Sequence, residues 1–184
     1  MIDMEQARKP VQEFIESSLR SFAVERSDVM WSTFGLLAYP MGGWISANFD
    51  TEANSAEYVA AAHPHSSCPC GEDEWGRFND SCADFEFFDW SCLQLPTWEN
   101  EYHGADLDEG RPLHVRDLSG RDHFISTENK FICSLAFQFV RVVLLDQLNS
   151  MKGSPLLPKT RHRFGVQIPH SGFSEFWRAE DVVG

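Results

Sequence analysis

Five side chains that can bind a metal ion lie within about twenty residues of this chain. Thiolate and imidazole groups are the usual ligands of zinc, and four of them satisfy its tetrahedral preference. A zinc ion held here would support either a structural metal site or metal-assisted catalysis. The candidate metal ligands are His63, His65, Cys68, Cys70 and Cys82.

The spacing of these residues also fits an ordinary polar loop. Structural zinc sites generally separate paired cysteines by two to four residues, whereas one residue separates Cys68 from Cys70. Surface histidines and partly buried free thiols, which pack as small hydrophobic groups, would give the same pattern. The zinc site and the polar loop therefore both stay open as interpretations.

Common catalytic motifs are absent from the sequence. The chain carries no GxSxG elbow, no P-loop, no GxGxxG and no HExxH. Four further histidines are scattered among acids and arginines, and their spacing selects no acid/base pair. We therefore expect a protein that is not an enzyme and needs no cofactor, zinc being the alternative. These histidines are His114, His123, His162 and His170.

Negative charge is concentrated between Gly71 and Gly110. This segment holds twelve Asp and Glu residues, one basic residue, Arg77, and eight aromatic residues. A disordered acidic segment would be poor in aromatic residues, so we expect this one to be folded. Acidic loops are most often only solvated, but acids interleaved with aromatic residues also favour a surface that steers a basic protein partner. The predicted partner-binding residues are Glu72, Asp73, Glu74, Trp75, Asp84, Glu86, Asp89, Glu99, Glu101 and Tyr102.

The charge and hydropathy of the whole chain exclude several classes of partner. A formal net charge of −13 disfavours nucleic-acid binding, and the one basic cluster, Lys159, Arg161 and Arg163, is small. The apolar stretch from Phe131 to Leu145 is shorter than the roughly 20 residues of a membrane span. The chain starts without a secretion signal, and its five cysteines then favour reduced thiols. We expect a cytoplasmic protein with no membrane or nucleic-acid partner.

The helix and strand patterns of the sequence predict one α+β domain over residues 1–184. We expect a mainly antiparallel sheet, packed by an N-terminal helix and one long buried helix, to position these residues. The N-terminal helix could start at an Asp3 cap, or near Lys9 with Pro10 in its first turn. Residues 29–49 predict a hairpin around a turn at residues 40–43. The long apolar helix is expected from about Thr127 to Met151.

Other segments complete the predicted order. A short helix is expected at residues 51–63, strands at 84–90 and 91–95, and a loop at 101–121. Residues 161–170 alternate as a half-buried strand does. Residues 174–179 are expected to begin a short helix or a tail.

The order of elements and several aromatic motifs resemble a bacterial family, domain-of-unknown-function family 4303, whose members occur among the immunity proteins of polymorphic toxin systems. The resemblance covers nearly the whole chain. It runs through Trp31–Leu36, Ala47–Glu52, Phe88–Trp90, Trp98–Glu101, the strand His162–Pro169, and Phe176 with Trp177.

The resemblance implies an immunity protein that binds its cognate toxin and blocks it with no chemistry of its own. Many such toxins have basic clefts for nucleic-acid or nucleotide substrates, so an acidic face would imitate the substrate's charge. Residues 63–84 depart from the family pattern and are expected to be a Cys/His-rich acidic insertion or loop. The alternative is a zinc-binding domain or a metal-dependent enzyme that uses this segment.

Overall fold

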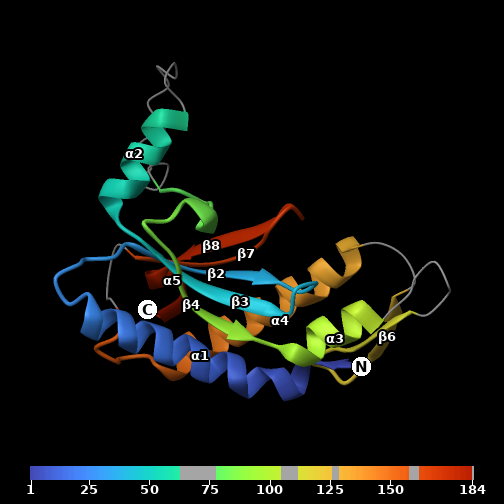
Figure 1. Ribbon diagram of the computed structural model, residues 1–184. Coiled ribbons are helices and arrows are strands. Elements are labelled where there is room, and N and C mark those ends of the chain that lie inside the picture. The colour runs from blue at the N-terminus through green and yellow to red at the C-terminus, as the bar shows by residue number, and fades with distance from the viewer. Residues whose placement is uncertain (63–77, 105–111, 126–128, 158–161, 184) are drawn as a thin grey trace.

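The computed structural model describes residues 1–62, 78–104, 112–125, 129–157 and 162–183. In Figure 1 these residues form a body in which helices pack against a sheet. The predicted α+β class is confirmed, with mostly antiparallel strands, an N-terminal helix and a long buried helix packed on the sheet.

The larger sheet contains β2 (Thr33–Tyr39), β3 (Trp44–Asp50), β4 (Phe87–Gln94), β7 (Arg163–Ile168) and β8 (Phe173–Arg178). Its strand order is β4-β3-β2-β7-β8. β2 and β7 pair in parallel, and every other neighbouring pair is antiparallel. β4 and β8 therefore form the two outer edges of this sheet.

A smaller sheet lies beside the larger one and contains β1 (Ile2–Asp3), β5 (Leu113–Arg116) and β6 (Asp122–Ile125). β5 pairs with β1 in parallel and with β6 antiparallel. The predicted loop at residues 101–121 is wrong over residues 101–104, which are helical, and over β5, whose buried Leu113 and Val115 alternate with more exposed residues.

The predicted hairpin at residues 29–49 is confirmed as β2 and β3. The turn between them contains Gly43, whose φ of 62° lies in the left-handed region that favours glycine. A Cβ atom on Gly43 would also lie 2.7 Å from the backbone oxygen of Leu95. The turn thus brings β3 and the end of β4 together.

The N-terminal helix α1 spans Met4–Glu25. Asp3 caps it by accepting a hydrogen bond from the backbone N–H of Gln6 at 3.1 Å. Of the two expected starts, the one near Lys9 is wrong, because Pro10 lies inside the helix. Burial of Met4, Ala7 and Val11 offsets the backbone hydrogen bond that Pro10 cannot make.

The long helix α4 spans Asn129–Ser150 and packs beside α1 on one face of the larger sheet. Its stretch Phe131–Ser150 has a mean hydropathy of 1.6 and is long enough to cross a membrane by length and composition, but 56% of its most apolar part is buried inside this protein. The apolar residues of α4 therefore serve the core.

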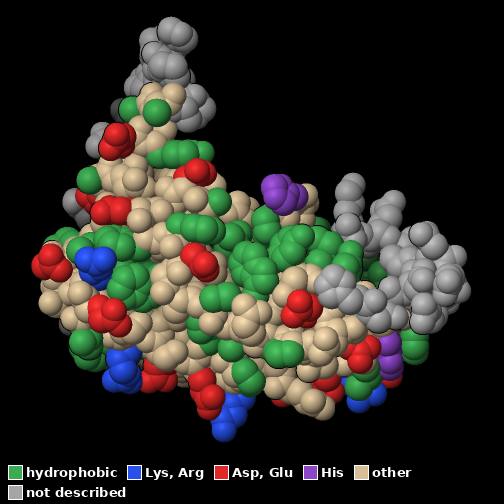
Figure 2. All heavy atoms as spheres, in the orientation of Figure 1, with side chains coloured by type: hydrophobic (Ala, Val, Ile, Leu, Met, Phe, Trp, Pro, Cys, Tyr) green, Lys and Arg blue, Asp and Glu red, His purple; other side chains and the backbone are tan. Residues whose placement is uncertain are grey.

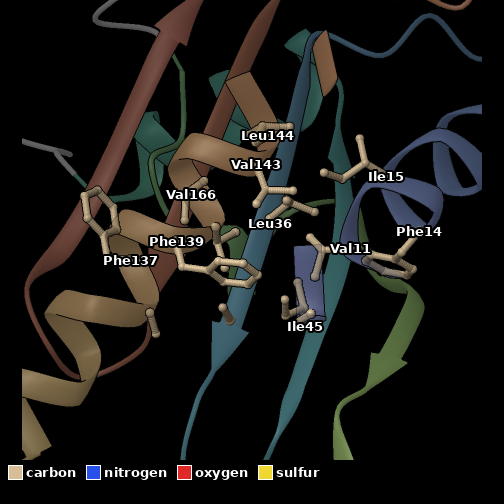
Figure 3. Close-up of a cluster of buried hydrophobic side chains, with 14 of the residues drawn as sticks. Val11, Phe14, Ile15, Leu36, Ile45, Phe137, Phe139, Val143, Leu144 and Val166 are labelled. Carbon is tan, nitrogen blue, oxygen red and sulfur yellow. The ribbon is translucent and has the colours of Figure 1, made fainter. Parts of the chain in front are cut away.

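Figure 3 shows the core between the two helices and the sheet. Each fully buried aliphatic or aromatic side chain stabilises the fold by roughly 1.5–3 kcal/mol relative to an exposed one. The side chains that meet here include Val11 and Ile15 of α1, Phe139, Val143 and Leu144 of α4, and Leu36, Ile45 and Val166 of the strands.

Three shorter helices, α2 (Glu52–Ala62), α3 (Pro96–Gly104) and α5 (Ala179–Val183), and a 3₁₀ turn, η2 (Cys82–Asp84), complete the described structure. α2 confirms the predicted short helix and projects away from the sheet in Figure 1. The expected helix or tail at residues 174–179 is wrong, because these residues belong mainly to β8 and pair with β7.

Candidate functional site

Five acidic side chains follow one another along η2, β4 and α3. Residues 82–104 contain these five acids and no Lys or Arg. Asp84, Glu86, Asp89 and Glu99 are exposed, and Glu101 is half-exposed. We call Asp84, Glu86, Asp89, Glu99 and Glu101 the acidic rim. Figure 2 shows acidic side chains spread over this face of the molecule, with hydrophobic side chains between them.

The first part of the acidic rim is fixed by contacts with the start of α2. The hydroxyl of Thr51 donates to Glu86 Oε2 at 2.5 Å. The side chain of Asp84 hydrogen-bonds to Tyr58, and this bond is the main reason that the pKa of Tyr58 is raised. Both carboxylates thus have a defined position and remain accessible.

Asp50, which sequence reasoning missed, lies fully buried beneath these two residues. Its carboxylate accepts hydrogen bonds from Asn54 Nδ2 at 2.7 Å, Ser55 Oγ at 2.5 Å and the backbone N–H of Glu86 at 3.2 Å. Thr51, directly after the strand, caps α2 by accepting from the N–H of Asn54 at 3.2 Å. Asp50 joins the end of β3, the start of α2 and the start of β4.

Asp89 interrupts β4 with a φ of 54°, in the left-handed region. Its backbone N–H donates to Asn48 Oδ1 at 2.7 Å, where the pairing of β3 with β4 shifts between Ala47 and Phe49. This bulge explains why the sequence 84–90 does not alternate cleanly. It also turns the carboxylate of Asp89 to the surface.

Most aromatic residues near the acidic rim belong to the core. Trp98 and Phe85 are buried, and Trp90 packs on Phe22 while its Nε1 donates to Ser21 Oγ at 3.1 Å. Phe88 is 48% exposed. Phe88 is therefore the exposed aromatic residue of this segment, whereas Phe87, Trp90 and Tyr102 are partly buried.

The last part of the acidic rim lies on α3. Glu99 is exposed, while Glu101 forms an ion pair with the amino group of Met1. Tyr102 is half-buried and packs against the core. Of these three predicted contact residues, Glu99 is therefore the one whose charge is exposed to a partner.

Several predicted residues lie outside the described part of the chain. They are the partner-binding residues Glu72, Asp73, Glu74 and Trp75 and the metal ligands His63, His65, Cys68 and Cys70.

Cys82, the remaining predicted metal ligand, is buried in a small cluster with Leu37 and Phe85. Burial raises the pKa of its thiol far above the ordinary value. A Cβ atom on Gly35 would lie 2.5 Å from its sulfur, so the thiol is pressed against the sheet. Among the described residues, no group of three His, Cys, Asp or Glu side chains is placed to hold a metal ion.

Arg163, which the sequence placed in a small basic cluster, is buried and forms an ion pair with Asp80. Its guanidinium lies 5.2 Å from the ring centroid of Phe78 and 4.9 Å from that of Phe176. Its Nη1, like Thr33 Oγ1 on the paired strand, is buried without a hydrogen-bond partner in the described structure. Arg163 is therefore part of the interior of the fold.

Two hollows follow one face of α1, and the first of them reaches β4. The first, of about 270 Å³, lies between the start of α1, at Gln6 and Pro10, and the end of β4, at Gln94. The second, of about 450 Å³, is shallow and continues along α1 past Ser17 and Ser21. Ser18, next to Ser17, hydrogen-bonds to Ser91 of β4, which holds helix and strand side by side.

Comparison with known proteins gives no match among protein-family models, curated proteins or solved structures. The resemblance to the immunity family therefore stays a prediction that rests on the sequence motifs. The geometry of the acidic rim is the observation from which a function can be argued.

Proposed function

We propose that this chain is a cytoplasmic immunity protein that binds a basic bacterial toxin through the acidic rim and neutralises it by occlusion, without chemistry of its own. The observation that carries the proposal is the run of exposed carboxylates at Asp84, Glu86, Asp89 and Glu99, in a segment with no Lys or Arg. Such a one-signed surface attracts a partner of opposite charge.

The dimensions of the rim suit a protein partner. β4 contains eight residues and is roughly 26 Å long at ~3.3 Å per residue, with Glu86 just before it and Glu99 beyond its end. A standard protein interface covers about 800 Å² on each partner, a patch of similar width. Exposed Phe88 lies within this span and supplies an apolar contact among the charges.

The acids are expected to act mainly on the rate of association. Exposed charges at an interface raise the association rate by long-range attraction, and salt screens that attraction. Binding of the toxin should therefore slow as ionic strength rises. Dissociation should depend more on the apolar contacts.

The experiment tests the product of the gene next to the one for this chain as the candidate toxin. That toxin should arrest growth when it is expressed alone and should be harmless when it is expressed with this chain. Asp89→Lys combined with Glu99→Lys should slow association by about tenfold or more at low salt. The matched control is Glu180→Lys combined with Asp181→Lys, which makes the same change of charge on α5 and should leave the rate nearly unchanged.

Two outcomes would remove this proposal. One is a toxin that stays lethal in the presence of the folded chain. The other is equal association rates for the rim variant and the α5 control, which would show that the acidic rim takes no part in binding.

A further inference from the structure

We infer that the open edge of β4 binds a short, extended, basic segment of the partner as an added strand, seated between β4 and α1. This inference rests on the proposed function and names the mode in which the partner is held. Its two arguments are the direction of the backbone groups of β4 and the charge around them.

The hydrogen bonds between β3 and β4 fix which backbone groups of β4 point outward. The N–H of Leu95 donates to the carbonyl oxygen of Gly43, and the ladder then continues with Leu93 opposite Ile45. Antiparallel residues alternate between facing the neighbouring strand and facing away from it. Cys92 and Gln94 therefore direct their N–H and C=O groups away from the sheet.

These outward groups are open to a partner. β4 is the outermost strand, and the side chains of Cys92 and Gln94 are both exposed. No backbone hydrogen bond joins either residue to another element in the described ranges. An edge with free N–H and C=O groups is a template for an added strand.

The space beside this edge can hold a chain. The hollow of about 270 Å³ begins at Gln94 and is bounded by Ala7 and Pro10 of α1. The shallow hollow of about 450 Å³ continues on the same helical face through Ser17 and Ser21. An added strand on β4 would enter the first hollow, which reaches Gln94, whereas the second hollow is lined by α1 alone.

The chemistry of this space selects a basic occupant. Asp3 and Glu13 line the hollows, Glu13 being paired with Lys9 at 3.6 Å. Asp89 lies within β4, and Glu99 lies beyond its end. The one arginine that lines them, Arg20, is already paired with Glu16 at 2.7 Å. Lysine or arginine side chains on an added strand would meet these carboxylates on both sides.

A free backbone acceptor adds to this preference. Pro10 has no N–H, so the carbonyl of Gln6 lacks its usual helical donor. Both residues line the first hollow. A donor from the bound segment, such as a lysine ammonium group, can satisfy that carbonyl.

The bulge sets the length of the added strand. Regular pairing on β4 stops where Asp89 takes its left-handed conformation, so the outward hydrogen-bonding positions are those at Cys92 and Gln94. Two such residues offer up to about four main-chain hydrogen bonds. The bound segment is thus a single short strand and not a hairpin.

The other outer strand, β8, does not meet the same description. Its one acidic residue, Glu175, accepts hydrogen bonds from Arg141 Nε at 2.9 Å and from Trp177 Nε1 at 2.6 Å. It ends in Arg178, and the acids that follow, Glu180 and Asp181, lie on α5, where Glu180 pairs with Arg178 at 3.7 Å. Charge therefore distinguishes β4 from β8 as the docking edge.

The test uses the full chain and a short, acetylated and amidated peptide in which lysine and valine alternate. Titration followed by NMR should shift the amide signals of Cys92 and Gln94 and slow their hydrogen exchange. An analogue N-methylated at alternate residues keeps the charge but lacks the donors, and it should bind at least about tenfold more weakly. A peptide in which glutamate replaces lysine should not bind.

Matched protein variants test the same edge. Gln94→Pro removes an outward N–H and should weaken peptide binding, whereas Gln94→Ala keeps that N–H and should bind as the unchanged chain does. If Gln94→Pro does not fold, the N-methylated peptide still decides the question. Absence of binding by the lysine–valine peptide, equal binding of its N-methylated analogue, or signal shifts away from β4 would each overturn the inference.

The outcomes separate this inference from the proposed function. Peptide binding at β4 together with a toxin that is not neutralised would reject the proposed function alone. A toxin that is neutralised, combined with a peptide that does not pair with β4, would reject the added strand alone.

Discussion

The ring of Phe176 covers Gly165 across the β7–β8 pair. The two residues are direct partners in the antiparallel register, and a Cβ atom on Gly165 would overlap the ring. Phe176 also stacks over the guanidinium of Arg163 and lies near Phe85. This contact fixes β8 as a strand and covers the sheet face opposite α1 and α4.

Gly165→Ala should lower the free energy of unfolding by about 1–3 kcal/mol, because the added methyl group must displace the Phe176 ring. Chemical denaturation measures this change. The same substitution made together with Phe176→Leu should cost less than the sum of the two single changes. Ser174→Ala, at an exposed position of β8, is the control and should change stability by less than about 0.5 kcal/mol.

Asp50→Ala should destabilise the fold by roughly 3 kcal/mol, because the buried Ser55 hydroxyl and two further donors lose their acceptor. Asp50→Asn keeps one acceptor oxygen and should cost less. Thermal unfolding of both variants measures the difference. Equal melting temperatures for Asp50→Ala and the unchanged chain would show that this carboxylate does not join β3, α2 and β4.

The carboxylate of Asp117 should make the folded protein less stable as the pH is lowered into the acidic range. The imidazole of His123, 2.8 Å from Asp117 Oδ2, lowers the pKa of this carboxyl well below its ordinary value, and the Ser119 hydroxyl lowers it further. A carboxyl whose pKa is lowered in the folded state stabilises the fold at pH values above its pKa in the unfolded chain, about 3.9. This contribution to stability is lost as pH falls below that value.

Asp117→Asn is the variant that isolates this effect. Its melting temperature should lie below that of the unchanged chain at neutral pH, and the gap should narrow below about pH 4. Thermal scans across pH measure the gap. A gap that stays constant down to strongly acidic pH would contradict the role of Asp117.

Cys92 should react with an alkylating reagent in the folded protein, whereas Cys82 should react only after unfolding. Cys92 is exposed and Cys82 is buried. Partial burial and the nearby Asp89 raise the pKa of the Cys92 thiol, so its alkylation should speed up as pH rises above neutral. Peptide mapping by mass spectrometry distinguishes the sites, and early labelling of Cys82 would contradict its placement.

Cys82→Ala should leave the zinc content of the purified protein unchanged. Its sulfur packs among Gly35, Leu37 and Phe85, which offer no further ligand. Elemental analysis of the two proteins, purified without a histidine tag, measures the content. A loss of stoichiometric zinc in the variant would place Cys82 in a metal site and revive the zinc-dependent alternative.

Periodic segments were predictable because their pattern reports one buried face. The apolar residues of α1 and α4 recur at helical spacing, and the glycine-containing turn marks the β2–β3 hairpin. β7 alternates, with Phe164, Val166 and Ile168 on the buried face. In these elements the local pattern and the tertiary structure agree.

The strands β4 and β8 were harder to recognise from the sequence, because each of their faces carries both polar and apolar residues. On β8, Glu175 and Trp177 face the helices while Ser174 and Phe176 face the other side, so no simple alternation survives. On β4 the left-handed Asp89 breaks the pattern. The acids of the surface could be predicted from composition, but the burial of Asp50 could not, because its partners come from α2 and from Glu86, which is distant in the sequence.

The left-handed turn at Asp89 also bears on aggregation. An open strand edge invites pairing between identical chains, and proteins limit this hazard with bulges, short edges and charge. β4 combines a bulge with charge, and two copies that each carry a net charge of −13 repel one another as they approach. The irregularity that spoils the strand pattern therefore helps the protein to stay dispersed at high concentration while its edge remains open to a chain of opposite charge.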